Sequence, residues 1–138
     1  EVYTQALRGL YEHDPNLMLG LAQAQFAAGD AAAARATLDA LIAHNPEFRS
    51  AEGHLLYARA LEAEGDAARA ESEYRAVIES YPGAEATVRW AAFLRRQGRR
   101  GEADAALREL LRTAELVPQH ARKAQAEWLD AARRELGG

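Results

Sequence analysis

The side chains best suited to acid–base catalysis or metal binding are four histidines, His13, His44, His54 and His120. His13 and His44 stand in the runs HDP and HNP, where helices are expected to end and a cation interacts favourably with the helix dipole. His54 lies in a predicted helix, where its side chain is expected to pack against neighbouring residues and not to take part in catalysis. The chain has no HExxH motif, no histidine pair four residues apart and no histidine–carboxylate cluster. The sequence therefore predicts no metal site.

Candidate nucleophiles are equally sparse. Serine occurs only at Ser50, Ser72 and Ser80, none of them in a GxSxG motif, and cysteine is absent. Ser50 is placed to cap a helix N-terminus, and no glycine-rich phosphate loop is present. We therefore expect no catalytic residue, no cofactor and no enzymatic activity.

The charge balance is mildly acidic, with 17 Lys and Arg against 21 Asp and Glu, a net charge of −4. Nucleic-acid-binding domains usually carry a basic excess, so nucleic acid is not an expected partner. The local cluster RRQGRR, residues 95–100, has no interleaved aromatic residues and is interpreted as a solvated turn. No run approaches the roughly 18 apolar residues of a membrane span, so no membrane contact by this segment is expected.

The first residue is Glu1 rather than methionine, which leads us to expect a piece of a longer protein. The absence of cysteine is compatible with the cytoplasm, the compartment we expect. A periplasmic chain, or one tethered to a membrane through an upstream segment, stays an open alternative.

The elements that must position any functional side chain are helices, because strong helix formers dominate the sequence and no stretch alternates as a strand would. Two eighteen-residue phrases, 29–46 and 65–82, both begin with Gly-Asp and end with Pro. The repeat has a third copy: at matching intervals stand the glycines Gly29, Gly65 and Gly98, the alanines Ala22, Ala58 and Ala91, and the alanines Ala34, Ala70 and Ala103. Such periodicity predicts stacked helical hairpins.

Each repeated residue type has a physical reason. Glycine ends a helix because it enters the left-handed conformation without strain, and Asp30 and Asp66 then cap the next helix. The alanines let the two helices approach closely. Large apolar residues at matching positions, Leu38, Tyr74 and Leu107, are expected to fill the space between hairpins.

This pattern resembles the tetratricopeptide repeat (TPR) family, with a small residue at position 8, a turn glycine near 15, alanine at 20 and proline at 32. The resemblance covers about residues 15 to 115 and implies an all-α, α-α superhelix of hairpins. One domain over 1–138 is expected, with repeats at 15–46, 50–82 and 84–115. The family's tryptophan at position 4 is replaced by Met18, His54 and Thr87, and the third turn, GRRG, lacks the aspartate cap.

The two ends are expected to add one helix each, which makes eight. Residues 2–13 are interpreted as the second helix of a preceding, truncated repeat. Residues 119–136 are interpreted as a capping helix with an apolar stripe, Trp128, Leu129, Ala132 and Leu136, and charge on its other faces.

The resemblance implies that the first helices of the repeats line a concave face that binds partner peptides through positions 2, 5, 9 and 12 and their neighbours. The predicted peptide-binding residues are Leu19, Gln23, Phe26, Leu55, Arg59, Glu62, Val88, Arg89, Ala92 and Arg95. The alternative interpretation is that Leu19, Leu55 and Val88 pack against neighbouring helices instead. A chaperone-tail carboxylate clamp is not expected, because Arg89 alone matches its pattern.

The leading interpretation is a non-catalytic protein–protein interaction scaffold. The alanine- and arginine-rich composition resembles that of bacterial TPR-containing proteins, so we expect a fragment of such a protein. Two alternatives stay open. In the first, the segment is a self-association module that forms a homo-oligomer through its terminal helices. In the second, it is the regulatory arm of a larger protein that is tethered to a membrane elsewhere.

Overall fold

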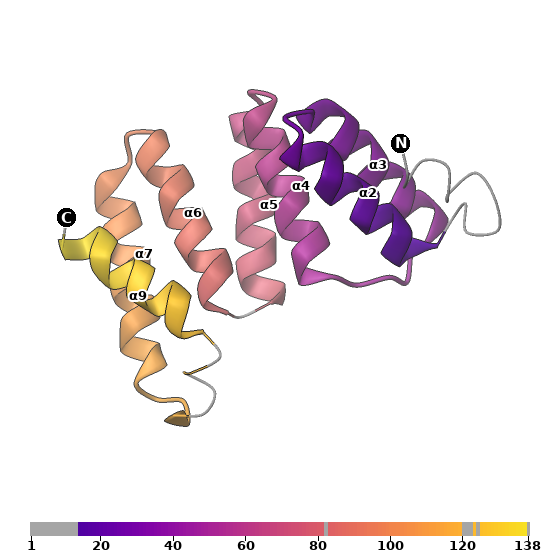
Figure 1. Cartoon of the computed structure of the whole chain (residues 1–138). Helices are drawn as coiled ribbons and strands as arrows, with labels where there is room; N and C mark the ends of the chain where they lie inside the picture. The colour runs from indigo at the N-terminus through magenta and orange to yellow at the C-terminus, as the bar shows by residue number, and fades with distance from the viewer. Residues whose placement is uncertain (1–13, 82, 120–122, 124, 138) are drawn as a thin grey trace. The chain divides into compact units, whose positions relative to one another are not determined.

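A computed structural model describes residues 14–81, 83–119, 123 and 125–137. Within these residues the chain is all-α, with no strand (Figure 1). The helices are α2 (Pro15–Ala27), α3 (Ala31–His44), α4 (Ala51–Ala63), α5 (Ala67–Ser80), α6 (Ala84–Arg96), α7 (Arg100–Ala114) and α9 (Ala126–Gly137). The helix predicted over 2–13 and the histidines His13 and His120 lie outside the described residues.

The chain divides into two compact units, Glu1–Tyr74 and Arg75–Gly138, and the division falls inside α5. In the first unit, α2 and α3 form an antiparallel hairpin and α4 packs against both. The middle of α5 is held to α4 by the hydrogen bond from the Tyr74 hydroxyl to Glu62, 3.0 Å long. In the second unit, α6 and α7 form a hairpin, and α9 packs against both of them.

The predicted turns are confirmed. Gly29, Gly65 and Gly98 have φ of +88°, +91° and +77°, the left-handed region that favours glycine. Oδ1 of Asp30 accepts the Ala33 N–H at 3.0 Å, and Oδ1 of Asp66 accepts a backbone N–H of α5 in the same way. The third hairpin has Arg99 at the N-cap and no side-chain cap hydrogen bond, as the GRRG turn predicts.

Replacing Gly65 by alanine is expected to lower the free energy of unfolding by about 1–2 kcal/mol, because a Cβ is strained at this φ even though the space around it is empty. Gly101 is the matched control, since it lies in the first turn of α7 and an added Cβ would meet nothing within 4 Å. Gly101→Ala is expected to raise stability by about 0.5 kcal/mol. Urea denaturation followed by circular dichroism measures both changes, and equal signs would contradict the assigned backbone conformations.

The small residues predicted to lie between the helices are buried. The three alanines of position 8 and the three of position 20 are all buried, as are Leu38, Tyr74 and Leu107. Because a buried alanine carries only a methyl group, it lets neighbouring helix backbones approach closely, and the larger buried side chains fill the remaining space. The first helix of each hairpin carries the predicted binding residues, and its packing against the second helix fixes its position.

Of the helix predicted over 119–136, Gln119 and Lys123 are helical, Gln125 lies in a turn, and α9 begins at Ala126. The side-chain oxygen of Gln125 accepts the N–H of Ala84, the first residue of α6. That helix has Gly83 at its N-cap and no side-chain cap of its own. Gln125 thus supplies from a distant part of the sequence the cap that Gly83 cannot, which fixes the start of α9 beside the start of α6.

Candidate functional site

The candidate interaction surface of the first unit is formed by α2 and α4, the first helices of their hairpins, which we call A helices. The guanidinium of Arg59 on α4 lies 4.7 Å from the ring centroid of Phe26 on α2. Beside this pair, Gln23 Nε2 donates to Glu52 Oε2 at 3.1 Å across the same two helices. Gln23 and Glu52 are exposed, whereas Phe26 and Arg59 are half-buried. The surface therefore combines an aromatic ring, a cation and an amide–carboxylate pair.

The other three predicted residues of this unit are more strongly engaged inside it. Leu55 is 6% exposed. Such burial agrees with the alternative interpretation, in which Leu55 packs against neighbouring helices instead of contacting a partner. Leu19 is half-buried, and one of its methyl carbons lies 3.5 Å from the position that a Cβ on Gly53 would take. Glu62 accepts a hydrogen bond from the Tyr74 hydroxyl. Position 5 of each A helix in this unit thus faces its own unit, whereas Gln23 at position 9 faces solvent.

The predicted residues of the second unit lie on α6. Val88 is 8% exposed and packs in the core, and Ala92 is half-buried. Arg89 donates to Glu85 at 2.9 Å, and its guanidinium lies 5.0 Å from the ring centroid of Trp128 on α9. Arg95 donates to Asp104 Oδ1 at 2.6 Å and to the carbonyl oxygen of Glu135 at 3.1 Å. Both arginines therefore join α6 to α9.

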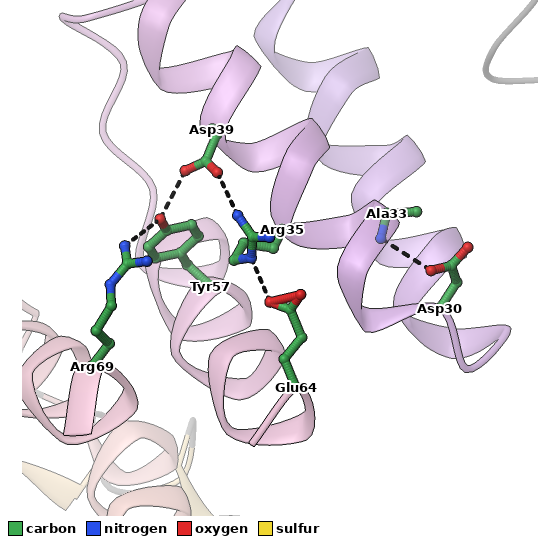
Figure 2. A network of polar contacts seen from close by, with 7 residues as sticks. All are labelled: Asp30, Ala33, Arg35, Asp39, Tyr57, Glu64 and Arg69. Atoms are coloured by element: carbon green, nitrogen blue, oxygen red, sulfur yellow. Dashed lines mark hydrogen bonds and ion pairs between the residues drawn. The ribbon is translucent and has the colours of Figure 1, made fainter. Parts of the chain in front are cut away.

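A polar network in the first unit was not predicted from the sequence (Figure 2). The Tyr57 hydroxyl donates to Asp39 at 2.7 Å and accepts from Arg69 at 3.0 Å, which links α3, α4 and α5. Arg35 on α3 pairs with Asp39 at 3.0 Å and also with Glu64 at the end of α4. The network ties one hairpin to the next through groups 12 to 29 residues apart.

Burial raises the pKa of the Tyr57 phenol above its usual value of about 10, and the hydrogen bond to Asp39 acts in the same direction. Because the folded pKa is the higher one, this stabilisation is fully present below pH 10 and is lost as pH rises through the folded pKa. Tyr57→Phe is expected to lower the free energy of unfolding by about 1 kcal/mol at pH 7. It should also flatten the alkaline fall in stability, measured by urea denaturation between pH 7 and 11. An unchanged alkaline fall would contradict this role.

The histidines that the structure describes occupy structural positions. His44 is the last residue of α3, where its charged form would favour the helix dipole. His54 Nε2 lies 2.8 Å from Glu73 Oε1, a contact between α4 and α5. Within the described part of the chain, no three His, Cys, Asp or Glu side chains are grouped to hold a metal ion. The same residues contain no helix with the length and apolarity that crossing a bilayer requires.

Comparisons with solved structures show the same fold. The crystal structure of PcrH in complex with the chaperone binding region of PopB aligns with a TM-score of 0.72 at 18% identity, covering 93% of this chain and 98% of that one. MamA aligns with a TM-score of 0.67 at 15% identity, covering 98% and 81%. The Yersinia enterocolitica type III secretion translocator chaperone SycD, in an alternative dimer, aligns with a TM-score of 0.63 at 17% identity, covering 88% and 92%.

Sequence comparison places the family. No curated protein sequence matches the chain. Two sequence profiles described as tetratricopeptide repeat match residues 1–60 and 52–84, the part in which the Gly-Asp phrases recur. Together with the hairpins, their left-handed turn glycines and their buried alanines, these matches agree with the predicted resemblance. The chain belongs to the tetratricopeptide repeat family.

Proposed function

We infer that the chain is a non-catalytic protein-interaction scaffold that binds a segment of a partner protein on the A-helix face of its first unit. The observation that carries this proposal is the Phe26–Arg59 stack with the Gln23–Glu52 pair beside it. An aromatic ring offers apolar contact area, and a guanidinium held over it keeps N–H donors in its plane for a carboxylate or a backbone carbonyl.

The exposed Gln23–Glu52 pair supports the same proposal. Both groups are solvated, so their hydrogen bond contributes little to stability and exchanges readily for one to a bound peptide backbone. PcrH, which shares the fold, is seen in complex with the chaperone binding region of PopB. Binding of another protein's segment is thus compatible with this arrangement of hairpins, and the partner of the present chain is a matter for experiment. The cytoplasmic location stays a prediction.

Site-specific photo-crosslinking tests the proposal. A p-benzoylphenylalanine at position 23, on the A-helix face, is compared with one at position 36, an exposed alanine of α3. The full chain is expected to crosslink a defined protein from position 23 and not from position 36. Equal crosslinking from both positions would refute a partner site on the A-helix face.

Arg59→Glu then measures the contribution of the stack. Its charge reversal is expected to weaken binding of the crosslinked protein at least tenfold, about 1.4 kcal/mol, as followed by calorimetry. The matched control is Arg112→Glu, which makes the same charge reversal at an exposed arginine on α7. Gln25→Glu is not used as the control, because Gln25 accepts a hydrogen bond from Thr37 that the change would disturb. The control is expected to leave the affinity unchanged, and equal losses in both variants would count against the Phe26–Arg59 surface.

The alternative of self-association through Trp128 gains no support from its surroundings. Trp128 is half-buried, and the Arg89 guanidinium lies over its ring. The side chain is therefore already used inside its own unit, and self-association through this helix stays a prediction without a structural observation in its favour.

A further inference from the structure

Helix α2 has three sides, and two of them pack against helices of its own unit. On the first side, Gln25 accepts a hydrogen bond from Thr37 of α3 at 2.7 Å. On the second side, Phe26 lies against Arg59 of α4. The third side consists of uncharged residues three or four positions apart, the first two half-buried and the last two exposed: Leu17, Leu21, Ala24 and the C-cap residue Ala28. The whole of α2 contains no charged residue, which is typical of a helix that is covered on every side.

The matching side of α4 and of α6 meets the helix that comes before it in the chain. Tyr57 and Trp90 match Leu21, because each of the three stands directly before a buried alanine of its A helix. The Tyr57 hydroxyl donates to Asp39 of α3, the helix before α4, at 2.7 Å. The guanidinium of Arg75 on α5, the helix before α6, lies 4.9 Å from the ring centroid of Trp90. At both junctions this position therefore contacts the preceding helix.

Burial distinguishes α2 from the other two A helices. One turn beyond Leu21 stands Ala24, which is exposed, whereas the matching Ala60 of α4 and Phe93 of α6 are 0% and 1% exposed. Leu21 itself is half-buried, whereas the aromatic residues at its position in α4 and α6 are buried. The third side of α2 is therefore the place at which a preceding helix would pack.

The segment that leads into α2 repeats the pattern of the second helix of a hairpin. Residues 7–15 read LRGLYEHDP, and residues 38–46, at the end of α3 and just after it, read LDALIAHNP. The two stretches share two leucines, a histidine and a proline at the same spacing. The segment ends at Asp14, the N-cap of α2. As a helix, residues 2–13 would span about 18 Å, close to the length of α2.

We propose that residues 2–13 form a helix that docks on the third side of α2, so that the chain itself covers this apolar surface. Leu7 and Tyr11 are four positions apart and therefore lie on one side of that helix. They supply apolar contact area for Leu17 and Leu21, and an aromatic ring contributes a large share of such area. Because α2 carries no charge, no side chain of α2 repels the charged residues at the rim of the docked helix.

Arg8 defines the register of the docked helix. It stands in the stretch LRGL at the place that Asp39 has in LDAL, and Asp39 is the residue that reaches Tyr57 at the next junction. Arg8 therefore lies beside Leu21, the residue that matches Tyr57. The proposal does not depend on a partner site on the A-helix face. It assigns the third side of α2 to the same chain and leaves no room there for a second copy.

Thiol crosslinking on the full chain tests the proposal, because the chain contains no cysteine of its own. The first pair of changes is Arg8→Cys with Ala24→Cys, on the third side. The matched control is Arg8→Cys with Gln23→Cys, since Gln23 is the adjacent residue and is also exposed, but lies toward α4. A short bismaleimide is expected to join the first pair within one chain at least tenfold faster than the control pair.

Two outcomes of the crosslinking would overturn the proposal. A segment that moves freely would reach positions 23 and 24 equally, so equal rates would contradict docking. Crosslinks that form between two chains and increase with protein concentration would also contradict it, because a second copy would then cover α2.

Backbone chemical shifts of the full chain provide a second measurement. An isolated helix of this length is marginal in water, so helical Cα shifts over residues 3–12 report docking. Leu21→Glu is expected to reduce these shifts to random-coil values, because a charge then meets Leu7 and Tyr11, while the shifts of α4 to α7 persist. Ala36→Glu, at an exposed alanine of α3, is the matched control and is expected to leave the segment helical. Random-coil shifts in the parent chain, or helical shifts that Leu21→Glu leaves unchanged, would overturn the proposal.

Discussion

Replacing Phe93 by alanine is expected to lower the free energy of unfolding by about 3–5 kcal/mol. Phe93 is 1% exposed on α6 and stacks on Trp90 with ring centroids 5.7 Å apart. The Arg75 guanidinium lies over the other ring of this pair, 4.9 Å from the Trp90 centroid. Alanine at position 93 would leave a cavity and remove one member of the stack. Urea denaturation, followed by circular dichroism, measures the change.

Val117→Ala is the control for this variant, because it also removes apolar volume in the second unit but from a partly exposed site after α7. It is expected to change stability by less than about 0.5 kcal/mol. Tryptophan fluorescence gives a second readout, since Trp90 should become more solvated in Phe93→Ala. A loss of under 1 kcal/mol for Phe93→Ala, with unchanged fluorescence, would contradict the packing described for α6.

Leu61→Ala is the corresponding change in the first unit, with an expected loss of about 2–5 kcal/mol. Leu61 is 1% exposed on α4, the helix that carries Arg59 and contacts both α2 and α3. Removing its side chain leaves a void in the packing of α4, the helix that carries part of the proposed binding surface. The change in the urea midpoint, together with the amide exchange rates of α4, measures the effect.

Leu116→Ala is the matched control, because the same side chain is 76% exposed there. The control is expected to stay within about 0.5 kcal/mol of the parent chain. Since repeat proteins are stabilised largely by near neighbours, faster amide exchange in Leu61→Ala should be strongest within α2, α3 and α4. Equal losses for Leu61→Ala and Leu116→Ala would mean that α4 is not packed as described.

The hairpins were predictable because their signals are local. Gly29 ends one helix by adopting a positive φ, and the next residue, Asp30, caps the N-terminus of the following helix. Both roles strongly favour particular residue types. The buried alanines repeat at a fixed spacing, so their role could be read without coordinates. The turn at Gln125 was not predicted, and neither was its hydrogen bond with Ala84, because that contact joins residues 41 positions apart.

The candidate site was less predictable, for the same reason. Position numbers identify which residues an A helix can present, but not what each one touches. Val88 and Arg95 are both at such positions, yet one packs in the core and the other is held by Asp104. The Tyr57–Asp39–Arg69 network has no sequence signature, because its members come from three different helices. The pairing of Phe26 with Arg59 likewise required coordinates.

The open space around the turn glycines has a practical consequence. Among the residues that the structure describes, a Cβ added to Gly29, Gly65 or Gly98 would meet no atom within 4 Å, so each of these positions has room for a side chain. Each doubling of a flexible loop costs only about 0.6 kcal/mol of closure entropy. A short epitope or a fluorescent reporter inserted beside one of these glycines is therefore expected to leave the helices paired and the proposed A-helix surface unchanged.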